Sequence, residues 1–331
     1  MNKAHLTFDL EAPGMNTGQL VVPGGADFEA ISLPVFSLNK GEGPSLLITG
    51  GCHGDELEGP IVAHRLIEWL PAAQTCGRII ILPVLNPLAV RAWSRNTPED
   101  GLNLNRVFPG RADGSVTERI ADGVSRLLLQ PVDIVFDLHS FGPTWDCAPS
   151  SLTHPIANAD LMARTFRMAE AFKLPVTLLW ESHDTAGMFD TWAQSQGKVF
   201  VGTEFGGGSV GSDNLAIYET GVRNALIALG LVDGKAESPT CHQRKPCQTL
   251  ETLSSDLIKS PARGIFEPRC SVLEEVQKGD LIGVLHSMDS ISADLIKFHA
   301  PSSSIVYGIR SGLHVDANEA LIRLARPLAG C

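Results

Sequence analysis

The feature that most constrains the fold is an alternation of strand-like and helix-like segments between residues 45 and 232. Short apolar runs such as SLLITG (45–50), RIIILPVL (78–85) and DIVFDLH (133–139) are typical of buried strands. Helical patterns lie between them, including one whose start, at Ser115 and Glu118, has the spacing of a capping box. This alternation predicts an α/β fold with a mostly parallel or mixed sheet and helices on both faces.

The segments on either side of this region have a different texture. Residues 1–43 contain short alternating pieces split by Gly and Pro, which predict an edge hairpin or strand pair. Residues 234–249 are polar and contain proline, as linkers often do, and only short β-like pieces follow. We therefore expect a catalytic domain over residues 1–235 and a small, barrel-like all-β module over residues 236–331.

Composition excludes several classes of protein. Hydrophobic residues make up 44% of the chain and charged residues 19%, so a packed core is expected and disorder is not. The net charge is −11 and no basic cluster stands out, which argues against nucleic acid or an anionic membrane as the partner. No apolar run approaches the roughly 18 residues of a membrane span. The seven cysteines are irregularly spaced, so we expect a cytoplasmic protein without a disulfide framework.

A candidate metal site begins where the first buried strand ends, in the sequence GGCHGDELEGP (50–60). His53 and Glu56 are three residues apart, and in the first turn of a helix both could face one ion. His139, at the end of the run DIVFDLH, is the best third ligand. Two histidines and one carboxylate leave a coordination position open, which is the catalytic rather than the structural zinc arrangement. The alternative is a solvated loop histidine and an unrelated core histidine.

Other residues suit hydrolysis at such a metal. Glu204, at the end of a third strand, is the candidate base that takes a proton from water, and the glycines after it would leave room for a substrate. The long segment 86–110 contains Asn105 and Arg106, whose donors suit a substrate carboxylate. Arg95 is a candidate for stabilising the oxyanion, although a surface charge is an equal alternative.

These motifs resemble those of a known family. GGCHGDELEG, NLNRVFPG, FDLHS and TEFGGG are similar to the succinylglutamate desuccinylase/aspartoacylase family of zinc carboxypeptidase-like hydrolases, over about residues 50–208. The resemblance implies one zinc ion held by His53, Glu56 and His139. It also implies Glu204 as the general base, a carboxylate site at Asn105 and Arg106, and a small N-acyl amino acid as the substrate.

The chain departs from the usual family pattern at Asn103, where the family's DLNR reads NLNR. SRNTPEDGLNLNRVFPG looks more like the bacterial branch that contains N-alpha-acetyl-L-2,4-diaminobutyrate deacetylase of ectoine breakdown. The side-chain ammonium of a diaminobutyrate needs an acidic partner. Glu181 and Asp184, in the loop after the strand-like VTLLW, are candidates; capping of the next helix by Asp184 is the alternative.

The C-terminal module resembles a biotinyl/lipoyl-type fold in the spacing of its strands, but Asp289 stands where such domains carry a modified lysine. We expect it to shape the entrance of the site or to build a contact in a homo-oligomer. Three rival functions stay open at this point. One is an aspartoacylase or succinylglutamate desuccinylase-type deacylase that acts on another N-acyl amino acid, and the second is a carboxypeptidase. The third is a non-catalytic binding protein that contains a metal.

Overall fold

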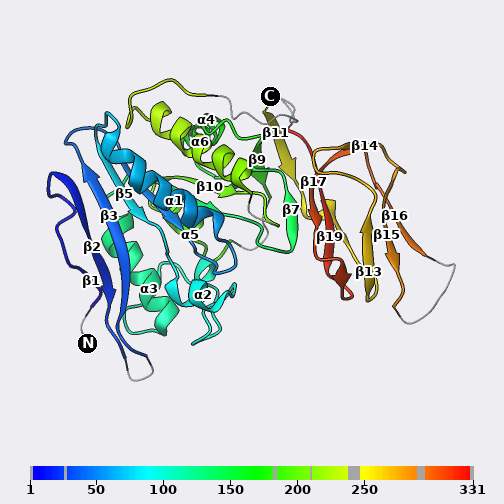
Figure 1. Cartoon of the computed structure of the whole chain (residues 1–331), viewed down its shortest axis with the longest axis horizontal. Coiled ribbons are helices and arrows are strands. Elements are labelled where there is room, and N and C mark those ends of the chain that lie inside the picture. Colours follow the sequence, from blue (N-terminus) through cyan, green and yellow to red (C-terminus); the bar gives the residue numbers. More distant parts are fainter. Residues whose placement is uncertain are drawn as a thin grey trace.

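The computed structural model describes residues 3–25, 28–181, 185–208, 211–237, 247–288 and 295–328. Figure 1 shows an elongated molecule, with the helices gathered in the N-terminal part and only strands labelled in the C-terminal part. The helices are α1 (Glu58–Trp69), α2 (Pro87–Ala92), α3 (Val116–Val124), α4 (Ala159–Ala171), α5 (Phe189–Ser195) and α6 (Ser212–Ala228).

The strands fall into an N-terminal and a C-terminal set. The first set is β1 (His5–Leu6), β2 (Gly14–Val22), β3 (Ile31–Asn39), β4 (Ser45–Gly50), β5 (Arg78–Leu82), β6 (Ile134–His139), β7 (Trp145–Cys147), β8 (Ser150–Thr153), β9 (Val176–Trp180) and β10 (Val199–Glu204). The second set is β11 (Gln248–Thr252), β12 (Leu257–Lys259), β13 (Gly264–Pro268), β14 (Glu275–Val276), β15 (Leu281–His286), β16 (Ile296–His299), β17 (Ser304–Arg310), β18 (His314–Val315) and β19 (Ala320–Pro327).

One large mixed sheet organises the molecule. In the described part of the chain it is 15-stranded, and its main path is β1-β2-β3-β5-β4-β6-β10-β8-β9-β11-β19-β17-β14. The central neighbours β5, β4, β6 and β10 run parallel to one another. The hairpin partners β1, β2 and β3 lie at one edge and are antiparallel, as predicted for residues 1–43. The predicted α/β class with a mixed sheet is therefore confirmed.

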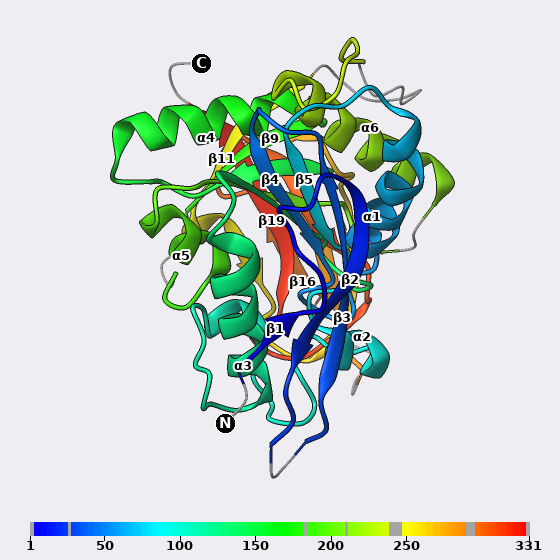
Figure 2. The ribbon, with the colours of Figure 1, turned by 90° about the vertical axis from the view of Figure 1, so that its left-hand side faces the viewer.

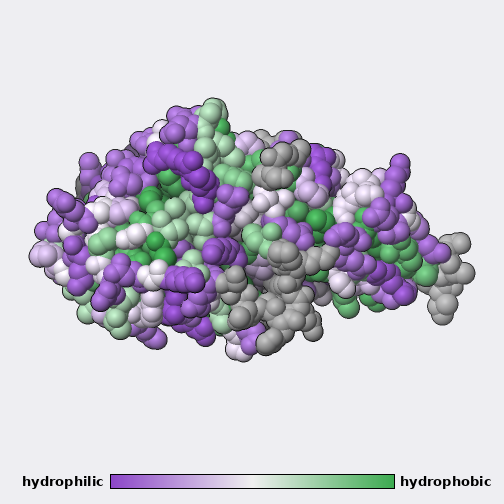
Figure 3. All heavy atoms as spheres, turned by 90° about the horizontal axis from the view of Figure 1, so that it is seen from above, coloured by the Kyte–Doolittle hydropathy of each residue, from purple (hydrophilic) through white to green (hydrophobic). Residues whose placement is uncertain are grey.

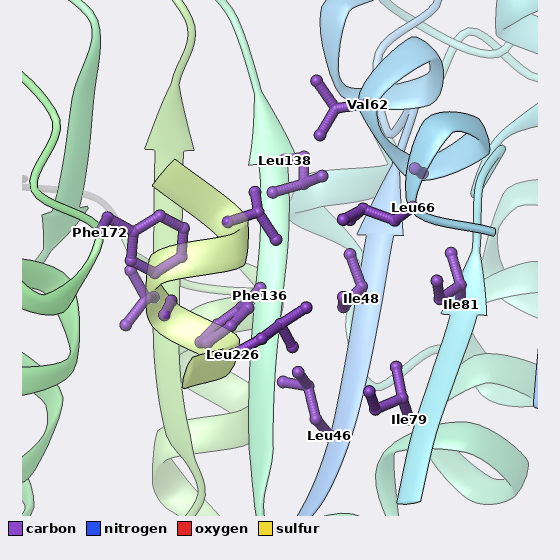
Figure 4. Close-up of a cluster of buried hydrophobic side chains, with 14 of the residues drawn as sticks. Leu46, Ile48, Val62, Leu66, Ile79, Ile81, Phe136, Leu138, Phe172 and Leu226 are labelled. Carbon is purple, nitrogen blue, oxygen red and sulfur yellow. The ribbon is translucent and has the colours of Figure 1, made fainter. Parts of the chain in front are cut away.

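Helices cover both faces of this sheet because its central strands are apolar on both sides. Leu46 and Ile48 of β4 pack with α1, α4 and α6 in one core cluster, whereas Leu47 between them belongs to a second cluster with α3 and α5. Figure 4 shows the first cluster, in which Phe136 of β6 lies near Leu226 of α6. Figure 2 shows α1 and α6 on one side of the strands and α3 and α5 on the other.

The elements differ from the prediction in two places. β7 and β8 lie in residues 145–153, where the sequence predicts no strand, and β8 separates β10 from β9 in the sheet. β8 has the sequence SSLT, which is too short and polar to give a strand signal, yet it is largely buried. β11 lies at the end of the expected linker and pairs with β9, so the main sheet continues into the C-terminal part.

The C-terminal strands appear close to where the sequence predicts them. A separate 4-stranded antiparallel sheet, β16-β15-β13-β18, supports the all-β character of this part, while β19 and β17 belong to the large sheet. β7 of the N-terminal part pairs with β17, which joins the two parts a second time. Asp289 lies outside the described residues, so the position expected for an acceptor lysine has no structural account.

Among the described helices, none has the length and apolar character needed to cross a membrane. Hydrophilic residues are spread over the face of the molecule in Figure 3, with hydrophobic atoms in smaller groups between them. The cytoplasmic location and the homo-oligomer stay predictions.

Candidate metal centre and active site

The candidate site lies at the carboxyl ends of three neighbouring parallel strands. β4 ends at Gly50, β6 ends at His139 and β10 ends at Glu204. His139 and Glu204 are direct partners in the register of the β6–β10 pair. Loops at this edge of an open α/β sheet are the usual place for a ligand site.

His53 and Glu56 lie in the loop before α1, not in its first turn as the sequence predicts, because α1 begins only at Glu58. The backbone N–H of Glu56 donates to the carbonyl of His53 at 3.4 Å, and this turn brings the two side chains together. Gly54 makes the turn fit: a Cβ at this position would lie 1.9 Å from the carbonyl oxygen of Ala89. Only glycine allows so close an approach of the following loop.

The structure brings His53, Glu56 and His139 together, with one ligand atom from each lying within 4.8 Å of the others. Nδ1 of His53 is 2.8 Å from Oε1 of Glu56, and Nδ1 of His139 is 2.8 Å from Oε2. The two imidazole rings are 5.0 Å apart between centroids. The two carboxylate oxygens of Glu56 thus each face the Nδ1 atom of one histidine.

The hydrogen bonds of Nε2, the ring nitrogen that faces away from Glu56 in each histidine, indicate whether this group suits a cation. Nε2 of His53 donates to Oδ1 of Asn103 at 3.1 Å, and this oxygen already accepts the N–H of Asn105. Nε2 of His139 donates to Oδ2 of Asp137 at 2.9 Å. In a neutral imidazole this leaves the lone pair on Nδ1. Two lone pairs then face a carboxylate, which is repulsive unless a proton or a cation lies among them, so the donor set fits a divalent metal ion.

The charges in this group have large effects on its pKa values. Burial alone would lower the pKa of His139, but the carboxylates of Asp137 and Glu56 outweigh burial and raise it well above its usual value. Burial alone would raise the pKa of Glu56, but His139 and His53 hold it well below its usual range. Because the pKa of His139 is raised, a proton competes with a cation for its Nδ1.

Asn103, the position where the chain departs from the family pattern, is a positioning residue for His53. Removing its oxygen in Asn103→Ala is expected to lower the affinity for the metal by about 10- to 100-fold, because the outer hydrogen bond fixes the ring and its tautomer. Competition against a chromogenic chelator measures this affinity. Asn103→Asp keeps an acceptor and is the matched control, in which most of the affinity is retained. Equal affinities in the wild type and in Asn103→Ala would contradict the role.

Glu204 lies beside this group, and its Oε2 is buried without a hydrogen-bond partner among the described residues. Burial, followed by the charge of Glu56, raises the pKa of Glu204 to about 8. One of the glycines after Glu204, Gly207, has a packing role. A Cβ on Gly207 would lie 2.5 Å from the carbonyl oxygen of Trp145, so this glycine allows two loops to pack closely instead of leaving room for a substrate.

The predicted anion-binding residues lie on the segment 86–110, which also contains α2 and a 3-10 turn at Leu104–Arg106. Oδ1 of Asn105 accepts the backbone N–H of Phe189 at 2.8 Å, which turns its NH2 group away from α5. Arg106 lines the same cavity as the candidate metal ligands, as does Arg95. Nη1 of Arg95 donates to Oε1 of Glu56 at 2.9 Å, so it contacts a candidate ligand directly.

A cavity of about 430 Å³ contains these groups, within the range typical of small-molecule sites. Residues that sequence reasoning missed also line it, among them His154 and Arg323. His154 directly follows β8, and its Nε2 is 2.7 Å from Oδ2 of Asp190. Arg323 of β19 stacks on Trp180, with its guanidinium carbon 4.5 Å from the ring centroid. A histidine after a strand was a usable signal for His154, but β8 itself was not recognisable.

Of the two residues expected to bind an ammonium group, only Glu181 is among the described residues. Glu181 is exposed and does not line the cavity; its backbone N–H bonds to the carbonyl of Thr252. Asp184 lies outside the described residues.

Comparisons with known proteins point to one protein family. Residues 42–229 match the family model described as the succinylglutamate desuccinylase/aspartoacylase catalytic domain. A curated protein named N-alpha-acetyl-L-2,4-diaminobutyric acid deacetylase, from Halomonas elongata, is 36% identical over 96% of this chain and 94% of its own length.

Several solved structures resemble nearly the whole chain, including one from Mesorhizobium loti and one from Ruegeria pomeroyi. An aspartoacylase family protein from Mesorhizobium loti is 64% identical, with a TM-score of 0.91, and the match covers 99% of this chain and 100% of that one. The product-bound ectoine utilization protein EutE (DoeB) from Ruegeria pomeroyi is 33% identical, with a TM-score of 0.89 and coverage of 98% and 99%.

Proposed function

Since this chain belongs to the succinylglutamate desuccinylase/aspartoacylase family of deacylating hydrolases, we propose that it removes the acetyl group of N-alpha-acetyl-L-2,4-diaminobutyrate with the help of one bound zinc ion. The convergence of His53, Glu56 and His139 beside Glu204 carries the proposal for the chemistry. The relative from Halomonas elongata, which aligns over nearly the whole of both chains, supports the choice of substrate.

His53 and His139 would hold the ion through Nδ1, and Glu56 would hold it through its carboxylate. When bound, zinc supplies Lewis acidity, which polarises the acyl carbonyl and allows water to lose a proton near neutral pH. Asn103 and Asp137 keep both imidazoles in the tautomer that presents Nδ1 to the ligand position.

Glu204 moves the proton. A divalent cation bound beside Glu204 would lower its pKa again, because a nearby positive charge favours the carboxylate. The carboxylate takes a proton from the water that attacks the acyl carbon and returns it to the departing amine nitrogen, so the C–N bond of the amide breaks and acetate and diaminobutyrate leave. Glu204 is the partner of His139 in the register of the sheet, and its buried Oε2 has no hydrogen-bond partner among the described residues. A rigid strand holds the base more precisely than a loop would.

The segment 86–110 orients the substrate. Arg106 and the NH2 group of Asn105 bind the α-carboxylate, which sets the scissile carbonyl toward the metal ligands. Arg95 lies at Glu56 and supplies positive charge where the tetrahedral oxyanion develops.

A residue of the C-terminal part lines the proposed active site. We propose that the chain consists of a catalytic domain, residues 1–235, and a barrel-like β domain, residues 236–331. Arg323 from β19 reaches the cavity and has its buried Nε without a partner among the described residues. The second domain would then form one wall of the site.

A panel of acylated amino acids tests the proposed function. The zinc-loaded protein is expected to hydrolyse N-alpha-acetyl-L-2,4-diaminobutyrate with a kcat/KM at least about 10-fold above that for N-acetylaspartate, N-succinylglutamate or a dipeptide. Release of the amine, followed by chromatography, gives the rates. A higher kcat/KM for another compound would overturn the proposed substrate assignment. Binding without turnover would favour a non-catalytic binding protein.

A further inference from the structure

The proposed substrate carries a side-chain ammonium group, and the acidic residues that line the cavity differ in whether they are free to receive it. They are Asp55, Glu56, Asp137, Asp190 and Glu204. Glu56 is the proposed metal ligand and Glu204 the proposed base. The other three must be compared by their partners, because a carboxylate that already accepts strong hydrogen bonds has little capacity left for a ligand.

Two of these three are occupied. Oδ1 of Asp137 accepts the hydroxyl of Thr49 at 2.6 Å, while Oδ2 accepts Nε2 of His139. Oδ2 of Asp190 pairs with His154, and its Oδ1 accepts the N–H of Thr191. The oxygens of both carboxylates therefore already have protein partners and are poorly placed to accept a hydrogen bond from a ligand.

Asp55 has no such ties. Its Oδ1 is buried, and no donor in the described part of the chain comes within hydrogen-bond distance of it. Among the described residues, its Oδ2 likewise has no hydrogen bond or ion pair. A carboxylate in a half-buried position normally finds a donor, since an unpaired one is costly. At the wall of a substrate cavity, the missing donor is most simply supplied by the substrate.

The surroundings of Asp55 also suit an ammonium group on a short methylene chain. A Cβ on Gly142 would lie 3.5 Å from Oδ2 of Asp55, so the carboxylate lies against this glycine. Phe141 and Trp145, on either side of Gly142 in the chain, line the same cavity, and their rings are 6.2 Å apart between centroids. Aromatic faces attract cations and pack against methylene groups, while a carboxylate supplies the charge-assisted hydrogen bond.

We propose that Asp55 binds the side-chain ammonium of the substrate and so selects N-alpha-acetyl-2,4-diaminobutyrate over acylated amino acids with neutral or anionic side chains. This inference rests on the proposed function. It replaces the exposed Glu181 with a residue inside the cavity, and it gives the acidic third position of the HGDE motif a role separate from metal binding.

Asp55→Asn keeps the size of the side chain and removes its charge. Wild type and variant are assayed with N-acetyl-2,4-diaminobutyrate and with N-acetylnorvaline, in which a methyl group replaces the ammonium. The ratio of the two kcat/KM values is expected to fall about 10- to 100-fold in the variant, mainly through KM for the charged substrate, because one charge-assisted hydrogen bond is lost. Asp113→Asn, at an exposed position, is the matched control and is expected to keep the wild-type ratio.

The ratio does not depend on how much enzyme is active, so a partial loss of metal next to the ligands cancels. Should Asp55→Asn be inactive with both substrates, calorimetric binding of 2,4-diaminobutyrate and norvaline gives the same comparison without turnover. An unchanged ratio in Asp55→Asn, with the wild-type preference intact, overturns the role of Asp55 and leaves the proposed function standing. A wild type without preference for the charged substrate overturns the proposed function itself.

Discussion

Glu204→Gln is expected to lower kcat for N-alpha-acetyl-2,4-diaminobutyrate by about 100- to 10,000-fold, which is the range that a positioned general base contributes. Glutamine has nearly the same shape but cannot accept and return a proton. Because Glu204 already has its Oε2 unpartnered and buried, the substitution breaks no hydrogen bond of that atom in the described residues. Steady-state kinetics with the zinc-loaded variant measure the effect.

Two further measurements separate loss of the base from loss of the site. The metal content of Glu204→Gln is expected to equal that of the wild type, and its melting temperature is expected to be at least as high, since a buried carboxyl group near Glu56 is replaced by a neutral one. A variant that keeps its metal and also keeps more than about a tenth of the wild-type kcat would remove Glu204 from the proton transfer.

Glu56→Gln is expected to abolish tight metal binding and, with it, activity. The carboxylate faces Nδ1 of both His53 and His139, so its loss would remove one of the three proposed ligands and the negative charge between the two rings. The fall in affinity is expected to exceed the factor of about 10 to 100 that the loss of an outer hydrogen-bond partner produces. Added zinc is expected to raise the melting temperature of the wild type but not of this variant.

Glu68→Gln is the matched control for that substitution. Glu68 lies on α1, a few turns beyond Glu56, and is exposed. It is expected to bind zinc and to be stabilised by zinc as the wild type is. Retention of one tightly bound ion in Glu56→Gln would show that the cation binds elsewhere.

Much of the fold follows from local patterns. The buried runs that became β4, β6 and β10 are apolar on both faces, which only a sheet between two helical layers can bury. Because parallel strands end at the same edge, the positions of His139 and Glu204 at strand ends were enough to predict that they lie near the loop with His53.

The remainder depends on tertiary contacts that no local pattern contains. β8 is short and polar, and it exists as a strand because β10 and β9 pair with it on both sides. His53 and Glu56 share a turn because Gly54 allows the backbone to approach Ala89 closely. The sequence suggests instead that helical spacing brings the two side chains together. Arg323 stands in an apolar strand of the C-terminal part, and only the continuous sheet brings it to a cavity formed by distant residues.

Titration of the metal-free protein with zinc, while the hydrolysis of N-alpha-acetyl-2,4-diaminobutyrate is followed, is the most direct test of a metal-dependent deacylase built on His53, Glu56 and His139. The rate is expected to rise in proportion to added zinc and to level off at one ion per chain, with no such rise in His139→Ala. Full hydrolysis before any zinc is added, or an equal response in His139→Ala, would contradict it.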